Sequence, residues 1–327
     1  MTITKNTTQD WNNYWQGRSA KDSGDALVGV GIESNKILET HWLKFFAECE
    51  EDDIIVDLAC GAGSALKHAH AVGLPNLVGV DIAQDAVDIM QAKFPTAKGI
   101  TANLDNLPLN SGEADVIVSQ FGFEYAGKFE NVLAAAAEVT RISSKKAKVA
   151  LISHIEGGAI ERGCLNSLEQ IKTIEESGFL SVNETVFRAL FQLLERQPRA
   201  SQDDFNLALK PLNPAAEPIM TLLRSSQHQQ NDFTRFVYHM MDSSHKLITR
   251  FERYELNDCL GWVKNTRHEI EAYKGRMESM SNAALSEENI KEVSDFFKKH
   301  GFEINTLDKL YFKANDSAAA WALIASR

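Results

Sequence analysis

Short apolar runs alternate with amphipathic stretches between residues 53 and 156. The runs are rich in β-branched and aliphatic residues and occupy positions 54–56, 77–80, 97–101, 115–119 and 148–153. Stretches with apolar residues at helical spacing lie between them, at about 64–72, 84–93 and 128–141. The runs do not alternate strictly with polar residues, which is typical of strands buried on both faces. Strands that alternate with helices of this length predict a doubly wound parallel sheet.

Residues 157–285 show a different pattern, with hardly any strand candidates. Apolar residues recur there at spacings of three and four, as in the stretch 187–194. This periodicity predicts helices. Pro211, Pro214 and Pro218 predict the end of one helix and the start of the next, because proline breaks the helical hydrogen-bond pattern.

The strand and helix pattern returns after residue 285. Ser286, followed by two acidic residues, predicts the capped start of a helix, and Gly301 predicts its end. Residues 302–307 and 319–326 predict two final strands. The sequence therefore predicts an α/β fold, a doubly wound, mostly parallel seven-stranded sheet with a large α-helical lid inserted after the fifth strand.

The charge balance bears on the partners of this chain. The sequence has 34 basic and 45 acidic residues, a formal net charge of −11, in an otherwise ordinary globular composition. Proteins that bind nucleic acids or anionic membranes usually carry a basic excess or a basic stripe. We therefore expect a small-molecule substrate, with no nucleic acid and no membrane as a partner. A homodimer is left open.

Cysteine spacing and the chain start indicate the compartment. The four cysteines form no CxxC pair and show no zinc-ligand spacing, so we expect reduced thiols. The first residues lack the basic and apolar regions of a signal peptide, and no apolar stretch reaches the ~18 residues of a membrane span. These features predict a cytoplasmic protein. We expect no metal site, because no acidic or histidine cluster has ligand spacing.

The sharpest chemical signal is the segment Ile55-Val-Asp-Leu-Ala-Cys-Gly-Ala-Gly-Ser64. Here a strand leads through two glycines, Gly61 and Gly63, into a helix. Glycine lets the backbone turn with positive φ and approach a ligand closely. Dinucleotide-binding turns need a third glycine, and Leu66 stands at that position. This change disfavours a nicotinamide-dependent oxidoreductase, which is the alternative enzyme class.

The turn resembles the first motif of class I, Rossmann-like S-adenosylmethionine-dependent methyltransferases. Two further segments support the resemblance, Val78-Gly-Val-Asp-Ile82 and Asn103-Leu-Asp-Asn-Leu-Pro-Leu109 followed by residues 114–120. The family's last strand is antiparallel and lies beside the fifth, a role that suits residues 320–325. The resemblance implies S-adenosyl-L-methionine as the cofactor and S-adenosyl-L-homocysteine as the product.

The resemblance also implies which residues hold the cofactor. Asp57 binds the methionine amino group, Asp81 accepts from the ribose hydroxyls, and Asn103 meets the adenine amino group. The family usually has Asp at the last position, but an amide oxygen also accepts from that donor. The backbone N–H of Leu104 meets the adenine ring. The remaining expected cofactor-binding residues of this domain are Ala59, Gly61, Gly63, Ile82 and Gln120.

The N-terminal segment Trp11-Asn-Asn-Tyr-Trp-Gln-Gly-Arg18 is rich in aromatic residues that need burial. In similar methyltransferases such a segment folds over the cofactor. Tyr14 and Arg18 are four residues apart and could share one helical face, so we expect both to bind the cofactor. The alternative is an aromatic clasp on the outside of the domain.

The resemblance yields a division of the chain. Residues 1–50 form an N-terminal helical segment that covers the cofactor. Residues 51–156 and 286–327 form the Rossmann-like methyltransferase domain, and residues 157–285 form a helical lid that binds substrate. A lid favours a small, enclosed acceptor because closure excludes water.

Catalytic side chains are expected where the fourth and fifth strands end, because open parallel sheets bind ligands at that edge. Glu124 is a candidate base or amine ligand, Tyr125 a hydrogen-bond partner of the acceptor, and His154 a proton acceptor. The alternatives are a solvated loop carboxylate for Glu124 and a structural histidine for His154. We expect methyl transfer to an O or N atom of a small molecule, such as a specialised metabolite. A cofactor-binding interaction protein without activity is the non-enzymatic alternative.

Overall fold

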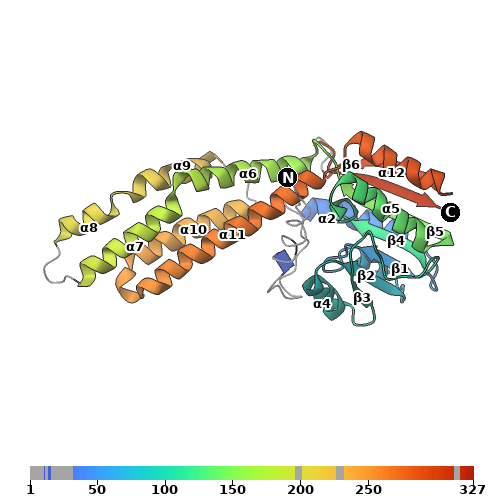
Figure 1. Ribbon diagram of the computed structural model, residues 1–327, viewed down its shortest axis with the longest axis horizontal. Coiled ribbons are helices and arrows are strands. Elements are labelled where there is room, and N and C mark those ends of the chain that lie inside the picture. Colours follow the sequence, from blue (N-terminus) through green and yellow to red (C-terminus); the bar gives the residue numbers. More distant parts are fainter. Residues whose placement is uncertain (1–10, 12–13, 16–31, 196–200, 226–231, 313–316) are drawn as a thin grey trace. The chain divides into compact units, whose positions relative to one another are not determined.

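The computed structural model describes residues 11, 14–15, 32–195, 201–225, 232–312 and 317–327. The chain divides into two compact units (Figure 1). The first comprises Met1–Cys164 with Gly275–Arg327, and the second comprises Leu165–Lys274.

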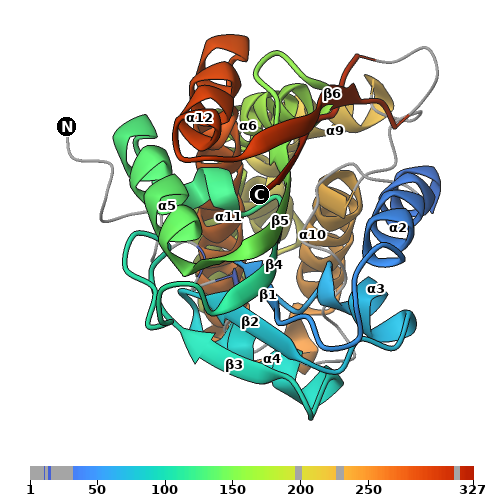
Figure 2. The same ribbon diagram turned by 90° about the vertical axis from the view of Figure 1, so that its right-hand side faces the viewer.

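The first unit is built on a seven-stranded sheet in the order β3-β2-β1-β4-β5-β7-β6 (Figure 2). The strands are β1 (Ile55–Leu58), β2 (Leu77–Asp81), β3 (Lys98–Thr101), β4 (Ala114–Gln120), β5 (Ser143–His154), β6 (Glu303–Leu310) and β7 (Ala320–Ser326). The first five are parallel, and β7 runs antiparallel between β5 and β6. The predicted fold class and the place of the last strand are confirmed.

Helices cover both faces of this sheet. Its helices are α2 (Ile32–Phe46), α3 (Leu66–Ala71), α4 (Gln84–Lys93), α5 (Phe129–Ile142) and α12 (Glu287–Lys299), with the short 3₁₀ helix η2 (Phe123–Ala126). Helices α5 and α12 pack against each other over one face, and α2 and α3 pack together over the other (Figure 2). All residues of β1 and β2 are buried, which explains why their sequences do not alternate.

The predicted ends of α12 follow from side-chain and backbone chemistry. Ser286 Oγ accepts the backbone N–H of Asn289, and Asn289 Oδ1 accepts the N–H of Ser286, which forms a reciprocal cap. Gly301 has a φ of +86°, the left-handed conformation that ends helices.

Every element described in the second unit is helical. The helical insertion contains α6 (Ala159–Ser177), α7 (Phe179–Glu195), α8 (Gln202–Leu209), α9 (Leu212–Ser225), α10 (Asp232–Thr249), the 3₁₀ turn η3 (Phe251–Arg253) and α11 (Leu256–Ala283). Apolar faces of these helices form a core of their own, which includes Phe187, Phe233 and Val263. None of the described helices is long and apolar enough to cross a bilayer. Whether the insertion serves as a lid stays a prediction.

The prediction from the three prolines is wrong in part. Pro211 lies between α8 and α9 and Pro214 lies in the first turn of α9, as expected, but Pro218 lies inside α9. Burial of the α9 face that carries Ile219 and Leu223 outweighs the backbone hydrogen bond lost at Pro218.

Candidate functional site

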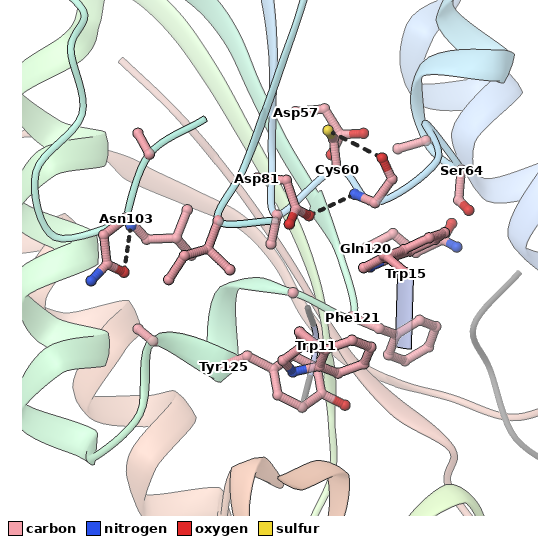
Figure 3. A pocket seen from close by; sticks show the side chains of 18 of the residues that line it. Trp11, Trp15, Asp57, Cys60, Ser64, Asp81, Asn103, Gln120, Phe121 and Tyr125 are labelled. Carbon is pink, nitrogen blue, oxygen red and sulfur yellow. Dashed lines mark hydrogen bonds between the residues drawn. The ribbon is translucent and has the colours of Figure 1, made fainter. Parts of the chain in front are cut away.

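A cavity of about 310 Å³ lies in the first unit, at the carboxyl ends of the parallel strands (Figure 3). Most residues expected at the site line this cavity: Asp57, Ala59, Gly61, Asp81, Ile82, Asn103, Leu104, Gln120, Tyr125 and His154. Residues on successive strands thus meet at one edge, because parallel strands end on the same side of a sheet.

Three of the described residues expected at the site, Tyr14, Gly63 and Glu124, do not line the cavity. Gly63 lies behind the turn against Phe94, and Glu124 is buried beneath the cavity wall. Tyr14 packs between other side chains, and Arg18 lies outside the described residues.

The glycine turn has the strained geometry that its sequence requires. Ala59, Gly61 and Gly63 have φ values of +51°, +51° and +83°. A Cβ atom at position 61 would lie 2.9 Å from the Trp15 ring, and one at position 63 would lie 2.7 Å from the Phe94 ring. Both glycines are therefore needed for close packing as well as for their backbone conformation.

Asp81, the last residue of β2, holds this turn through its carboxylate. Its Oδ2 accepts the backbone N–H of Gly61 at 2.8 Å, and its Oδ1 accepts that of Ala83 at 2.9 Å. Burial raises the pKa of Asp81, although these hydrogen bonds oppose the rise. Each oxygen keeps a lone pair for a ligand hydroxyl, so a structural role and a ribose-binding role are compatible.

Asp57 in β1 is a buried carboxylate with an unused acceptor atom. The side chain is 1% exposed, the backbone N–H of Leu66 bonds to the carboxylate, and Oδ2 has no hydrogen-bond partner. Burial, together with the charge of Asp81, raises the pKa of Asp57 well above its ordinary value. A ligand that brings a positive charge or N–H donors would satisfy this oxygen.

Asn103 and Leu104 bond to each other beyond β3. The Oδ1 atom of Asn103 accepts the backbone N–H of Leu104 at 3.0 Å. These are the two groups expected to meet the adenine ring, and here they satisfy one another. A bound ring would have to share or replace this hydrogen bond.

Glu124, Tyr125 and His154 form a connected polar group between η2 and the end of β5. Glu124 Oε1 accepts the backbone N–H of His154 at 2.8 Å and lies 2.9 Å from His154 Nδ1. Tyr125 Oη lies 3.1 Å from the same Nδ1 atom. Glu124 Oε2 and His154 Nε2 are buried and have no hydrogen-bond partner.

Two electrostatic consequences follow from this group. Glu124 is fully buried, so its interpretation as a solvated loop carboxylate is wrong. Burial raises the pKa of Tyr125 well above its ordinary value, and the charge of Glu124 raises it further. Tyr125 therefore stays a neutral hydrogen-bond donor.

The loop between β4 and η2 is shaped to hold this group. Phe121 has a φ of +54°, unusual for a residue other than glycine, and its ring stacks on the His154 imidazole with centroids 4.7 Å apart. Ser119 Oγ accepts the backbone N–H of Phe123 and donates to the carbonyl of Leu58, which fixes the loop to β1. Backbone strain of this kind gathers at functional sites.

The N-terminal aromatic residues approach the cavity differently from the prediction. Trp11 and Trp15 line the cavity, whereas Tyr14 lies between their rings and the Arg276 guanidinium, which is 4.7 Å from its centroid. Trp11 contacts Tyr125 edge to face. The two tryptophans are four residues apart, so helical spacing alone would have paired them.

Phe121 and Met280 also line the cavity and were not foreseen. Met280 lies in the last turn of α11, far from the other lining residues in the sequence, and no local pattern marks it. Phe121 directly follows Gln120 in the sequence but carries no polar group that would mark it. No group of three His, Cys, Asp or Glu among the described residues is placed to hold a metal ion.

Comparisons with known proteins identify the domain. Residues 56–151 match the methyltransferase domain family. The ubiquinone/menaquinone biosynthesis C-methyltransferase UbiE of Campylobacter jejuni is 27% identical over 171 residues, which cover 49% of this chain and 70% of that protein.

Two solved structures show partial similarity. A putative methyltransferase in complex with the Haloferax volcanii Trm112 activator is 22% identical, with a TM-score of 0.33 over 38% of this chain and 56% of that one. Geranyl diphosphate C-methyltransferase from Streptomyces coelicolor, solved with Mg²⁺, geranyl diphosphate and S-adenosyl-L-homocysteine, is 15% identical. Its TM-score is 0.36, over 46% of this chain and 66% of that one. The chain thus spans less than two thirds of either structure.

The family match coincides with the strands that carry the glycine turn and the two acidic residues, Asp57 and Asp81. Residues 56–151 thus match a methyltransferase domain, in agreement with the resemblance of the sequence to class I S-adenosylmethionine-dependent methyltransferases. Its cofactor is S-adenosyl-L-methionine rather than a nicotinamide dinucleotide. The unpartnered Oδ2 of Asp57 fits the ammonium group of this cofactor, because a buried carboxylate oxygen requires such a donor.

Proposed function

We propose that this chain methylates a hydroxyl oxygen of a small molecule, with His154 as the general base. The observation that carries the proposal is the unpartnered Nε2 of His154, held on a buried carboxylate at the cavity wall. A nitrogen acceptor is the other candidate. Methylation of an amine depends less on a general base than methylation of a hydroxyl, because a neutral amine already has a nucleophilic lone pair.

The order of residues along the sheet supports a division of the cavity. The strands β3, β2, β1, β4 and β5 are neighbours in that order, and at or near their carboxyl ends lie Asn103, Asp81, Asp57, Gln120 and His154. We assign the first four, with Ala59, Gly61, Ile82 and Leu104, to the cofactor, and the β5 end to the acceptor. When bound, S-adenosyl-L-methionine supplies an electrophilic methyl group on a sulfonium sulfur.

Glu124 sets the tautomer of the base. Its Oε1 accepts a hydrogen bond from the Nδ1–H group of His154, so the neutral imidazole has its free lone pair on Nε2. Nε2 takes the proton of the acceptor hydroxyl, and the Glu124 carboxylate stabilises the imidazolium that results. Tyr125, which stays protonated, donates a hydrogen bond from its hydroxyl to the acceptor, or its Oη accepts the Nδ1–H of His154 together with Glu124.

Aromatic side chains favour an acceptor with an apolar body. Trp11, Phe121 and Tyr125 line the cavity beside His154, and Met280 adds a flexible apolar contact. In this proposal the N-terminal segment 1–50 covers the cofactor, which the position of Trp11 and Trp15 supports. We assign the insertion 157–285 to acceptor binding, because its helix α11 carries Met280, which lines the cavity.

A carbon acceptor is a second candidate, favoured by the similarity to a C-methyltransferase. The same imidazole would remove a proton from an activated carbon. A phenolic hydroxyl and an acidic carbon flanked by electron-withdrawing groups both lose a proton to the base, so either acceptor could use the same imidazole.

The test is a screen with radiolabelled S-adenosyl-L-methionine and three acceptor sets: aromatic hydroxyl compounds, aromatic amines and carbon acids. We expect labelled product from hydroxyl compounds, and a loss of at least about 10²-fold in turnover for His154→Gln. Transfer to amines that His154→Gln leaves intact would overturn the proposed base. Binding of S-adenosyl-L-homocysteine without turnover on any set would favour a cofactor-binding protein without activity.

A further inference from the structure

A tryptophan outside the matched family region controls a polar side chain in the cavity. Trp42 in α2 is fully buried, and its Nε1–H donates to Oε1 of Gln120 at 2.6 Å. Gln120 is the last residue of β4 and lines the cavity. The two residues are 78 positions apart in the sequence.

This hydrogen bond decides which end of the Gln120 amide faces a ligand. An indole N–H can only donate, so the amide atom that it meets must be the oxygen. The amide NH₂ group is then left to point elsewhere. Gln120 therefore offers N–H donors to the cavity, and its partner there must be an acceptor such as a carboxylate oxygen.

The indole of Trp42 is itself held in place. Phe46 stacks on it with centroids 5.6 Å apart and planes 25° apart, and Phe45 and His41 contact it edge to face. A rotation of the Gln120 amide would leave the Trp42 N–H buried without a partner, which is costly. The contact therefore fixes the amide orientation before any ligand binds.

A complementary acceptor lies on the neighbouring strand. Asp57 of β1 is in register with Val118 of β4, and Gln120 is two residues further along, on the same face as Val118. The unpartnered Asp57 Oδ2 requires a cation or N–H donor, whereas the Gln120 amide nitrogen can only donate to an anion or oxygen. An α-amino acid group carries both partners, an ammonium group for Asp57 and a carboxylate for Gln120, on one carbon.

We propose that Trp42 is a positioning residue that fixes Gln120 as the donor to the carboxylate of the cofactor's amino-acid end. In Figure 3 Gln120 lies across the cavity from Asn103, with Asp81 between them, so the adenine and amino-acid ends fall on opposite sides. The inference does not depend on the acceptor, because it concerns the cofactor alone.

The experiment compares two ligands by calorimetry. S-adenosyl-L-homocysteine carries the amino-acid end, and 5′-methylthioadenosine has the same nucleoside and sulfur without it. We expect Trp42→Phe to lower the affinity for S-adenosyl-L-homocysteine about tenfold, which is the effect of losing one hydrogen bond to a charged group. Affinity for 5′-methylthioadenosine should change less than about twofold. Equal losses for both ligands, or none for the first, would overturn the proposal.

A double variant separates positioning from direct contact. Gln120→Leu removes the amide at similar size, and Trp42→Phe added to it should cause no further loss. An additional loss in the double variant would show that Trp42 acts by another route. Gln120→Glu keeps the acceptor for the indole and turns the donor into a negative charge. Gln120→Glu should lower the affinity only for S-adenosyl-L-homocysteine, the ligand with the carboxylate. This variant keeps the test decisive even if Trp42→Phe does not fold.

Phe46→Leu is the matched control for packing. It perturbs the same buried cluster of α2 without touching the hydrogen bond, so it should lower the melting temperature and leave the ratio of the two affinities unchanged. A change in that ratio equal to that of Trp42→Phe would assign the effect to packing and reject the proposal. A wild-type protein that binds neither ligand would reject the cofactor assignment itself.

Discussion

The Oε1 atom of Glu124 lies 2.9 Å from Nδ1 of His154 and 2.8 Å from the backbone nitrogen of the same residue. One carboxylate oxygen thus holds both the ring and the strand end that carries it. Both side chains are at most 1% exposed. Water cannot take over either contact, so the imidazole keeps one tautomer and one orientation.

Glu124→Gln should lower turnover about 10²-fold and leave the affinity for S-adenosyl-L-homocysteine unchanged. The amide still accepts both hydrogen bonds but lacks the charge that stabilises an imidazolium. Because the two residues act as a unit, Glu124→Gln combined with His154→Gln should be no slower than the slower single variant. Single-turnover rates and calorimetry provide the two readouts. Wild-type turnover in Glu124→Gln would make the carboxylate purely structural.

Asp57→Asn should stabilise the unliganded protein and weaken cofactor binding. Asparagine keeps the acceptor for Leu66 N–H and removes a buried charge next to Asp81. We expect a gain of about 0.5–2 kcal/mol in unfolding free energy at neutral pH, at the cost of function. Thermal unfolding and calorimetry measure the two effects. A variant that is less stable than the wild type would contradict the raised pKa.

The raised pKa of Asp57 also predicts a pH dependence. A carboxyl with a folded pKa above its unfolded value stabilises the fold fully at low pH. That contribution is lost as the pH rises through the folded pKa. The cofactor ammonium favours the ionised form, so affinity for S-adenosyl-L-homocysteine should rise with pH over the same range. Proton release on binding, measured in buffers of different ionisation enthalpy, checks this, and Asp57→Asn should abolish it.

Asp81→Ala should affect binding and stability together. The change leaves the buried N–H groups of Gly61 and Ala83 without their acceptor, at about 1–3 kcal/mol each. Cofactor affinity should fall at least about tenfold as the ribose acceptor is lost. Asp81→Asn keeps one acceptor oxygen and should be intermediate in both measurements. Unchanged affinity in Asp81→Ala would exclude the ribose assignment.

Gly122→Ala should destabilise the protein by about 1–3 kcal/mol. A Cβ atom there would lie 2.5 Å from Cβ and 3.0 Å from the carbonyl oxygen of Ala59, so the β4 loop and the glycine turn would be forced apart. Gly163→Ala in α6 is the control, because a Cβ meets nothing within 4 Å there. It should raise stability by about 0.5–1 kcal/mol. Chemical denaturation of both variants measures the difference, and equal values would contradict the clash.

The sheet could be predicted from the sequence because its signals are local. The buried runs, the glycine turn and the Ser286 cap each depend on neighbours within a few residues, and the strand order follows from the family resemblance. The extra length of β5, from Ser143 rather than Lys148, was missed because its first residues are polar and partly exposed. Pairing with β4 at Ala114 includes them in the strand.

The sequence by itself determined which residues stand at the ends of the parallel strands, since strand ends follow from hydrophobic pattern. It therefore placed Asp57, Asp81, Asn103, Gln120 and His154 at one edge. Only the tertiary structure decided how these side chains are partnered. The burial of Glu124 under His154, and the bond from Trp42 to Gln120, join segments 30 and 78 residues apart. Contacts over such distances depend on how helices pack on the sheet, which local periodicity does not encode.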